Sequence, residues 1–182
     1  MTYLQFPYQR VLVVGCGGAG KSTYSAELGA RFCLPVVHLD RLWWLPGWVN
    51  RSEEEFDALL CEELQKPAWV MDGNYLRTLP VRLAKADCAV LLDLSAKECL
   101  ASIRARVETY RGRSRPDMPE GCPERVDDEF ETWIRTYRDE TLPQVLRLLR
   151  ESALPSFVFS SRGQAYTWLE GFENRRGGRH FC

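Results

Sequence analysis

The sequence of 182 residues contains only two histidines, and its seven cysteines form no C-x-x-C pair. Structural zinc sites need four cysteine or histidine ligands at short spacings, so the sequence excludes a zinc-binding module. The scattered cysteines, odd in number, are typical of free thiols in a reducing compartment. We therefore expect the protein to be cytoplasmic.

An excess of charge and long apolar segments are also missing. The 24 basic and 25 acidic side chains give a net charge of −1. Domains that bind nucleic acid are usually strongly basic, so direct DNA binding is not expected. Apolar runs such as residues 11–14 are much shorter than a membrane span, and the first ten residues do not resemble a signal peptide. The sequence indicates no oligomeric state.

Five short apolar runs alternate with helical patterns along the chain. They lack the polar alternation of half-exposed strands, which indicates strands buried on both faces of a parallel sheet. The runs are residues 10–14, 34–39, 68–71, 88–92 and 156–160. Strands and helices that alternate in this way predict a doubly wound α/β domain with right-handed crossovers. We expect one domain over residues 1–173 and a flexible Gly/Arg-rich tail over residues 174–182.

Helix starts and one long helix can be predicted from local patterns. The S-x-x-E patterns at residues 52–55 and 95–98 are capping boxes. A helix is expected from about residue 127 to 150, kinked or divided at Pro143. Its buried stripe is expected to be Phe130, Trp133, Ile134 and Tyr137.

A glycine-rich motif follows the first predicted strand. Residues 15–22, "GCGGAGKS", fit the pattern G-x-x-x-x-G-K-[ST]. The backbone N–H groups of such a loop surround phosphate oxygens, Lys21 reaches the β- and γ-phosphates, and Ser22 binds Mg²⁺. A tight turn that needs glycines would not explain a lysine followed by a serine. We therefore predict an ATP site formed by Gly15, Gly17, Gly18, Ala19, Gly20, Lys21, Ser22 and Thr23.

Asp40, Asp72 and Asp93 each directly follow a predicted strand. Ligands of open parallel sheets bind outside the carboxyl ends of the strands, so three carboxylates at this edge indicate a metal-bridged site. One of them is expected to hold Mg²⁺, usually through water, as the partner of Ser22. By pattern alone Asp93 is as good a candidate as Asp72, and each aspartate could instead be a helix cap or turn residue.

The segment around residues 111–126 is rich in proline, glycine and arginine. Phosphoryl transfer needs cations on the moving phosphoryl group and exclusion of water, and a mobile arginine-rich lid supplies both. The alternative for each arginine is an ordinary solvated surface. The arginines of this region are Arg104, Arg106, Arg111, Arg113, Arg115 and Arg125. We expect Arg111 and Arg113 to act on the transition state.

The segment "VMDGNYLRTLP", residues 70–80, resembles the D-G-F-P-R-T segment of adenylate kinases. This resemblance favours Asp72 over Asp93 as the acid on the metal side. It also implies that Arg77 contacts a phosphate of the acceptor, although the match requires a slip of one residue. Asn74 lies in the same segment and is predicted to contact the acceptor substrate.

The lid region resembles the same kinases. "ERVDD", residues 124–128, is similar to the R-x-D-D motif that follows their lid, which places Arg125 among the catalytic arginines. The resemblance also implies phosphate contacts for Arg135 and contacts with the donor phosphates for Arg106.

Ser102 departs from the adenylate kinase pattern, in which an arginine stacks on adenine. Arg162, in the loop after the fifth predicted strand, is our candidate for that role.

Longer strings resemble the bacterial family of DNA topology modulation (FlaR-related) proteins. The matching strings are "HLDRLWWLPGW", "DGNY" and "YRGRSRPDMPEGCPE". This resemblance implies a P-loop NTPase of adenylate-kinase-like architecture, with helices on both faces of a five-stranded sheet of order 2-3-1-4-5. The family label records an effect on DNA supercoiling and gene expression, whereas the motifs resemble those of a kinase.

In such kinases the segment after the second strand forms the acceptor pocket, which here is residues 38–48. Asp40 is expected to hydrogen-bond a hydroxyl or base edge, and Arg41 to pair with an anion. Trp44 and Trp48 are expected to line the pocket, because aromatic faces stack on bases and cations. Burial in the core is the alternative for both tryptophans.

The stretch from about residue 41 to 67 has room for one helix rather than a multi-helix nucleotide-acceptor domain. This favours an acceptor smaller than a nucleotide, and shikimate- and gluconate-type kinases resemble this chain in having an Asp after strand two for a hydroxylated acceptor. A nucleotide, a nucleoside and a small hydroxylated metabolite all stay open as acceptors. We expect an ATP- and Mg²⁺-dependent small-molecule kinase. The alternatives are an ATP-switched regulator of DNA topology or gene expression without kinase activity, and a simple NTPase.

Overall fold

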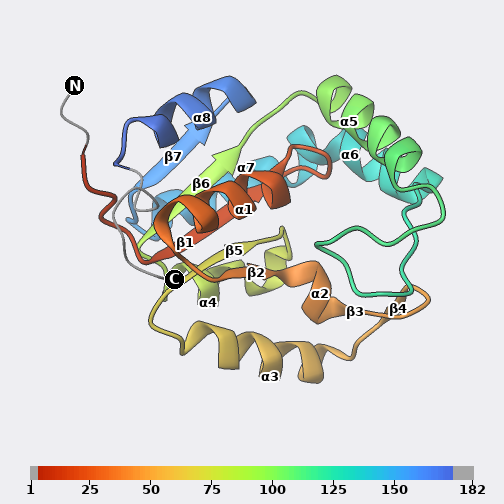
Figure 1. Cartoon of the computed structure of the whole chain (residues 1–182), viewed down its shortest axis with the longest axis horizontal. Helices are drawn as coiled ribbons and strands as arrows, with labels where there is room; N and C mark the ends of the chain where they lie inside the picture. The colour runs from red at the N-terminus through yellow and green to blue at the C-terminus, as the bar shows by residue number, and fades with distance from the viewer. Residues whose placement is uncertain (1–3, 174–182) are drawn as a thin grey trace.

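The computed structural model describes residues 4–173, which form a parallel sheet flanked by helices (Figure 1). The strands are β1 (Arg10–Gly15), β2 (Val36–His38), β5 (Trp69–Asp72), β6 (Cys88–Leu92) and β7 (Ser156–Phe159). Their order is β2-β5-β1-β6-β7, and every pairing is parallel. The predicted strands and the predicted order 2-3-1-4-5 are confirmed.

The continuous apolar runs explain the positions of the central strands. Residues 11–14 of β1 and residues 88–92 of β6 are at most 1% exposed. Such runs suit strands that are covered on both faces by helices. The edge strand β7 is half-exposed, and its residues alternate accordingly.

Helices cover both faces of the sheet. In Figure 1, α1 passes in front of the strands and α7 passes behind them. The helices are α1 (Lys21–Phe32), α2 (Leu39–Trp43), α3 (Glu53–Leu64), α4 (Leu79–Leu83), α5 (Ala96–Thr109), α6 (Asp128–Glu140), α7 (Leu142–Glu151) and α8 (Arg162–Glu170), with a 3₁₀ turn η1 (Leu76–Thr78). The capping boxes at residues 52–55 and 95–98 are both present, at the starts of α3 and α5.

The long predicted helix is divided. α6 ends at Glu140, and Pro143 lies in the first turn of α7, where its missing N–H costs nothing. Of the predicted stripe, Ile134 and Tyr137 are buried in the core, whereas Phe130 and Trp133 are half-buried and pack against the glycine-rich loop. A Cβ at Gly17 would lie 2.6 Å from the Phe130 ring, so a larger residue there would require this ring to move.

Two segments that are distant in the sequence pack together near the carboxyl ends of the strands. One is a short hairpin that the sequence analysis did not predict, β3 (Trp44–Leu45) and β4 (Val49–Asn50); we call residues 44–50 the aromatic hairpin. The other is the lid, residues 111–126, whose two arms meet at a bridge between Ser114 and Pro123. Figure 1 shows the lid turning inward from α5 toward α2 and β4.

Three hydrogen bonds connect the lid to the aromatic hairpin. Gly47 N donates to Gly121 O (2.8 Å), and Trp48 Nε1 donates to Pro123 O (3.0 Å). Cys122 Sγ donates to Leu45 O (3.2 Å). The lid is therefore folded onto the hairpin rather than extended into solvent.

The cysteines mostly agree with the expectation of free thiols. Cys16, Cys61, Cys88, Cys99 and Cys122 are free, whereas Cys33 is disulfide-bonded and departs from it. Within residues 4–173 no helix combines the length and apolar character that a membrane span requires. The tail predicted at residues 174–182 lies outside the described residues.

Candidate functional site

A cavity of about 890 Å³ lies at the carboxyl ends of the central strands. This is the edge at which open α/β sheets bind ligands. It brings together most of the residues predicted from the sequence: Gly17, Gly18, Gly20, Lys21, Ser22, Thr23, Asp40, Trp44, Trp48, Asp72, Asn74, Arg106, Arg125 and Arg162. Gly15 and Ala19 belong to the same loop but do not line the cavity.

The glycine-rich loop connects β1 to α1 and forms one wall of the cavity. Gly15, Gly18 and Gly20 have positive φ angles of 144°, 78° and 100°, which side chains with a Cβ rarely adopt. Lys21 Nζ donates to Cys16 O (3.0 Å) across the loop. Burial lowers the pKa of Lys21, and the nearby carboxylates of Asp40 and Asp72 oppose that shift. The loop therefore presents an ammonium group and a helix N-terminus at the place predicted for phosphates.

Asp72 lies at the end of β5, and its side chain is only 5% exposed. Its Oδ2 is 2.7 Å from Nδ1 of His38, the last residue of the neighbouring strand β2. Burial alone would lower the pKa of His38, but this hydrogen bond and the charges of Asp72, Asp117 and Asp40 raise it. Asp93 instead pairs with Arg138 (3.1 Å) and does not line the cavity, whereas Asp72 does.

The hydroxyl of Ser22 and the carboxylate of Asp72 are hard oxygen donors of the kind that Mg²⁺ prefers. Within the described part of the chain, no group of three or more His, Cys, Asp or Glu side chains has metal-binding geometry. The two side chains therefore suit a magnesium ion that keeps waters and is held largely by the phosphates of a nucleotide. Ser22 and Asp72 fit a magnesium ion because both side chains offer oxygen atoms as ligands.

Asp40 lies at the start of α2 and faces the cavity. The hydroxyl of Tyr75 donates a 2.7 Å hydrogen bond to Asp40 Oδ1. Burial raises the pKa of Asp40, while the Tyr75 hydroxyl and Lys21 act in the opposite direction. Asp40 is thus an oriented acceptor between the glycine-rich loop and the aromatic hairpin.

Hydrogen bonds hold the segment 72–75 both to the glycine-rich loop and to Arg82 of α4. Asn74 Oδ1 accepts a hydrogen bond from Gly15 N (3.1 Å), the first residue of the glycine-rich motif. Behind this segment, the fully buried Arg82 of α4 donates to the carbonyl oxygens of Gly73 (3.1 Å), Asn74 (2.6 Å) and Tyr75 (2.9 Å). Burial lowers the pKa of Arg82 to about 9. The sequence analysis missed Arg82, although a lone arginine within the apolar run 79–83 was a signal.

The three tryptophans of residues 38–48 all line the cavity, and one of them, Trp43, also packs against the core. Trp43 contacts Phe56 and Tyr75 edge-on and also lines the cavity. Trp44 and Trp48 contact each other edge-on, with centroids 5.2 Å apart, and both line the cavity. The guanidinium of Arg125 lies 5.1 Å from the centre of the Trp48 ring, as expected for a cation–π contact.

Two arginines enter the cavity from the lid side. Arg106 comes from α5 and Arg115 from the lid, and both contact the buried carboxylate of Glu124. Burial alone would raise the pKa of Asp117, but the charge of Arg115 and the nearby Ser22 hydroxyl bring it below its usual value. Asp117 of the lid therefore lies close to Ser22 of the glycine-rich loop. Arg115, Asp117 and Glu124 were not predicted as site residues.

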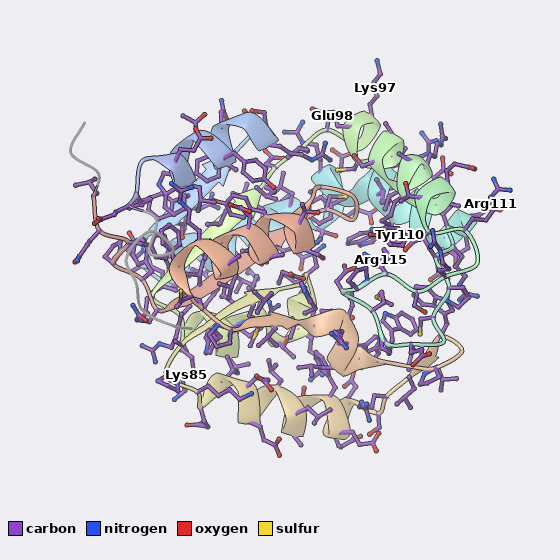
Figure 2. All side chains as sticks on the ribbon, in the orientation of Figure 1. Lys85, Lys97, Glu98, Tyr110, Arg111 and Arg115 are labelled. Atoms are coloured by element: carbon purple, nitrogen blue, oxygen red, sulfur yellow. The ribbon has the colours of Figure 1, made fainter. Side chains whose placement is uncertain are left out.

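Five predicted arginines are not brought to the cavity. Arg77 forms a two-pronged ion pair with Asp57 of α3 (2.8 and 2.9 Å), and Arg41 donates to Pro116 O (3.4 Å). Arg111 pairs with Glu108, Arg113 donates to Thr109 O, and Arg135 pairs with Glu131. In Figure 2, Arg111 extends from the outer edge of the molecule, whereas Arg115 points inward. Most of these guanidinium groups pair with residues of the same helix or of a neighbouring helix, and these pairings keep them at the surface.

Arg162 begins α8 and contacts the glycine-rich loop from the side opposite the lid. Its Nη2 donates to Gly18 O (2.7 Å) and to Ser102 Oγ (2.7 Å), and its Nε donates to Ala19 O (3.1 Å). The guanidinium therefore lies beside Ser102, the position where the resemblance to adenylate kinases implies a base-stacking arginine. A second, smaller pocket of about 100 Å³ lies next to Arg162.

The sheet order, the glycine-rich loop and the flanking helices define the fold of P-loop small-molecule kinases. No family model and no curated protein matches the sequence. Among solved structures, the chain is similar to shikimate kinase from Acinetobacter baumannii in complex with shikimate, with 20% identity over 90% of this chain and 92% of that chain (TM-score 0.58).

Two further structures have the same fold. One is shikimate kinase from Bacteroides thetaiotaomicron, with 16% identity over 90% of this chain and 95% of that chain (TM-score 0.54). The other is deoxyadenosine kinase from M. mycoides with bound dATP, with 14% identity over 88% and 97% (TM-score 0.52). At these identities the similarity shows the fold alone.

Proposed function

We propose that the protein is an ATP- and Mg²⁺-dependent kinase that transfers a phosphoryl group to a small molecule: a nucleotide, a nucleoside or a small hydroxylated metabolite. One observation carries this proposal. A single cavity is lined by Lys21, Ser22 and Asp72 and also by Asp40, whose carboxylate accepts a hydrogen bond from Tyr75. Phosphoryl transfer requires a site for the donor phosphates and a group that orients the hydroxyl of the acceptor substrate, and the two have to be aligned.

Each residue has a defined task in this reaction. The glycine-rich loop and Lys21 bind the phosphates of ATP, and Ser22 and Asp72 hold the metal ion, which neutralises the developing charge. Asp40 orients the attacking hydroxyl and accepts its proton. Arg106 and Arg115 stabilise the negative charge of the moving phosphoryl group, and the lid excludes water.

The solved structures support a small acceptor. The structures with the same fold include shikimate kinases, one of them in complex with shikimate, and a deoxyadenosine kinase, all named for small molecules. The connection between β2 and β5 contains α2, the aromatic hairpin and α3, so the acceptor side is formed by little more than one full helix. The resemblance to DNA topology modulation proteins rests on the quoted strings alone. An ATP-switched regulator is therefore the outcome that the experiment has to separate from a kinase.

The deciding experiment measures ADP release from Mg²⁺-ATP in the presence of nucleoside monophosphates, nucleosides and small hydroxylated metabolites. A kinase gives strong stimulation by one acceptor, and Asp40→Asn raises the KM for that acceptor and lowers kcat while basal hydrolysis persists. Slow hydrolysis that no acceptor changes would overturn the proposal and favour the regulator. Tight, ATP-dependent DNA binding at physiological salt would favour the regulator as well.

A further inference from the structure

Glu124, at the end of the lid, has a side chain that is only 1% exposed and two arginine partners. Its Oε1 accepts from Arg106 Nε (2.9 Å) and lies 2.7 Å from Arg106 Nη2. Its Oε2 is in ion-pair contact with Arg115 Nε, without hydrogen-bond geometry. One carboxylate thus joins a residue of α5 to a residue of the lid.

Burying such a group is unfavourable unless its partners compensate. Transfer of a carboxylate out of water costs several kcal/mol, and a single ion pair often does not recover that cost. Here two guanidiniums share the carboxylate, and Arg115 Nη1 also donates to Asp117 Oδ2 (2.6 Å). Burial and the neighbouring Arg115 lower the pKa of Arg106, and Glu124 opposes that shift. Glu124 therefore helps to hold the two arginines close together.

The contacts leave part of each guanidinium available. Arg106 uses Nε and Nη2 toward Glu124, and Arg115 uses Nε and Nη1 toward Glu124 and Asp117. Among the described residues, neither Arg106 Nη1 nor Arg115 Nη2 donates a hydrogen bond. Both arginines line the cavity that contains Lys21 and Ser22. Guanidinium N–H groups held in this way suit the oxygens of a phosphate.

We infer that Glu124 is a positioning residue that holds Arg106 and Arg115 toward the terminal phosphate of bound ATP. Because Arg106 belongs to α5 and Arg115 to the lid, the same carboxylate couples closure of the lid to recognition of that phosphate. This inference rests on the proposed binding of ATP, but not on the identity of the acceptor.

Glu131 provides a matched control. It also joins two arginines, Arg104 (3.3 Å) and Arg135 (2.5 Å), but it lies on the surface of α6, outside the cavity lining. Glu124→Gln and Glu131→Gln therefore remove the same charge from the same kind of arginine pair. An amide oxygen can still accept from one arginine, but the amide N–H₂ group cannot accept from the second.

The test compares both variants in steady-state turnover and in the ratio of ATP to ADP affinities. Glu124→Gln should lower kcat by about tenfold or more, with the KM for the acceptor changed by less than about threefold. It should also lower the ATP/ADP affinity ratio by about tenfold, because ADP lacks the terminal phosphate. Glu131→Gln should match the wild type. Arg106→Ala combined with Glu124→Gln should lose less activity than the sum of the two single losses, since part of the effect of Glu124 acts through Arg106.

Two results would overturn the inference: equal behaviour of Glu124→Gln and Glu131→Gln, or fully additive losses in the double variant. If Glu124→Gln does not fold, Glu124→Asp keeps the charge but shortens the reach, and it should show the same loss of ATP/ADP preference in weaker form. A wild type that binds ATP but responds to no acceptor would refute the kinase, whereas the affinity ratio would still decide the role of Glu124.

Discussion

The hydroxyl of Tyr75 donates a 2.7 Å hydrogen bond to Asp40, although the two residues are 35 positions apart in the sequence. Asp40 follows β2, and Tyr75 follows β5, the strand next to it. The contact therefore depends on sheet order: neighbouring parallel strands bring their carboxyl ends together. It joins the predicted acceptor side to the segment that carries Asp72.

Tyr75→Phe tests this contact. Loss of the hydroxyl removes a hydrogen bond that favours ionised Asp40, so the pKa of Asp40, which burial already raises, should rise further. If Asp40 must be ionised to accept a proton, activity should then be lost at a higher pH than in the wild type as the pH falls. The measurement is kcat/KM for the acceptor against pH. If the acid limb of the pH profile does not move, Tyr75 does not influence the ionisation of Asp40 during catalysis.

Lys21→Ala should abolish turnover, by about a hundredfold or more, because the phosphates lose their cation next to the helix N-terminus. The circular dichroism spectrum should be unchanged, since the side chain of Lys21 donates a single hydrogen bond within the described residues, to the Cys16 carbonyl. Full activity in this variant would refute the assignment of the glycine-rich loop as the phosphate site.

Local sequence patterns were sufficient to predict the strands of the sheet and the glycine-rich loop, whereas the strand order was implied by the family resemblance. Strands buried on both faces leave continuous apolar runs, and the loop motif carries its chemistry in adjacent residues. The division at Pro143 was predictable for the same reason, because proline acts on its own backbone.

The roles of the arginines were not predictable from spacing. Arg77 follows the segment 72–75 by two residues, but its ion pair with Asp57 of α3 holds its side chain at the surface. Arg115 and Glu124 meet only because the two arms of the lid fold against each other and against α5. Such pairings depend on tertiary contacts that no local pattern encodes.

Arg82→Ala should strongly destabilise the protein. Its guanidinium donates to three backbone carbonyls of the segment 73–75, and a small apolar side chain would leave those buried acceptors unpaired. We expect the free energy of unfolding to fall by about 3 kcal/mol. Lys85→Ala, two residues beyond the helix at an exposed position labelled in Figure 2, is the control and should change it by less than about 0.5 kcal/mol. Chemical denaturation measures both, and equal values would show that Arg82 does not support this segment.

The last prediction separates the arginines of the lid, where sequence and structure favour different residues. The sequence favours Arg111 and Arg113, but in the structure Arg111 pairs with exposed Glu108 and Arg113 donates to the carbonyl of Thr109. Arg115 lines the cavity, with a side chain only 10% exposed. Arg115→Ala should therefore lower kcat by about tenfold or more, while Arg111→Ala should stay within about twofold of the wild type.

Single-turnover kinetics should show that the loss in Arg115→Ala lies in the chemical step rather than in ATP binding, because the lid arginine acts on charge that develops during transfer. The reverse ranking, with Arg111→Ala or Arg113→Ala slower than Arg115→Ala, would mean that the lid rearranges on closing and presents its outer arginines to the phosphates. Unchanged turnover in all the variants would make the segment an ordinary solvated surface and would remove the lid from the mechanism.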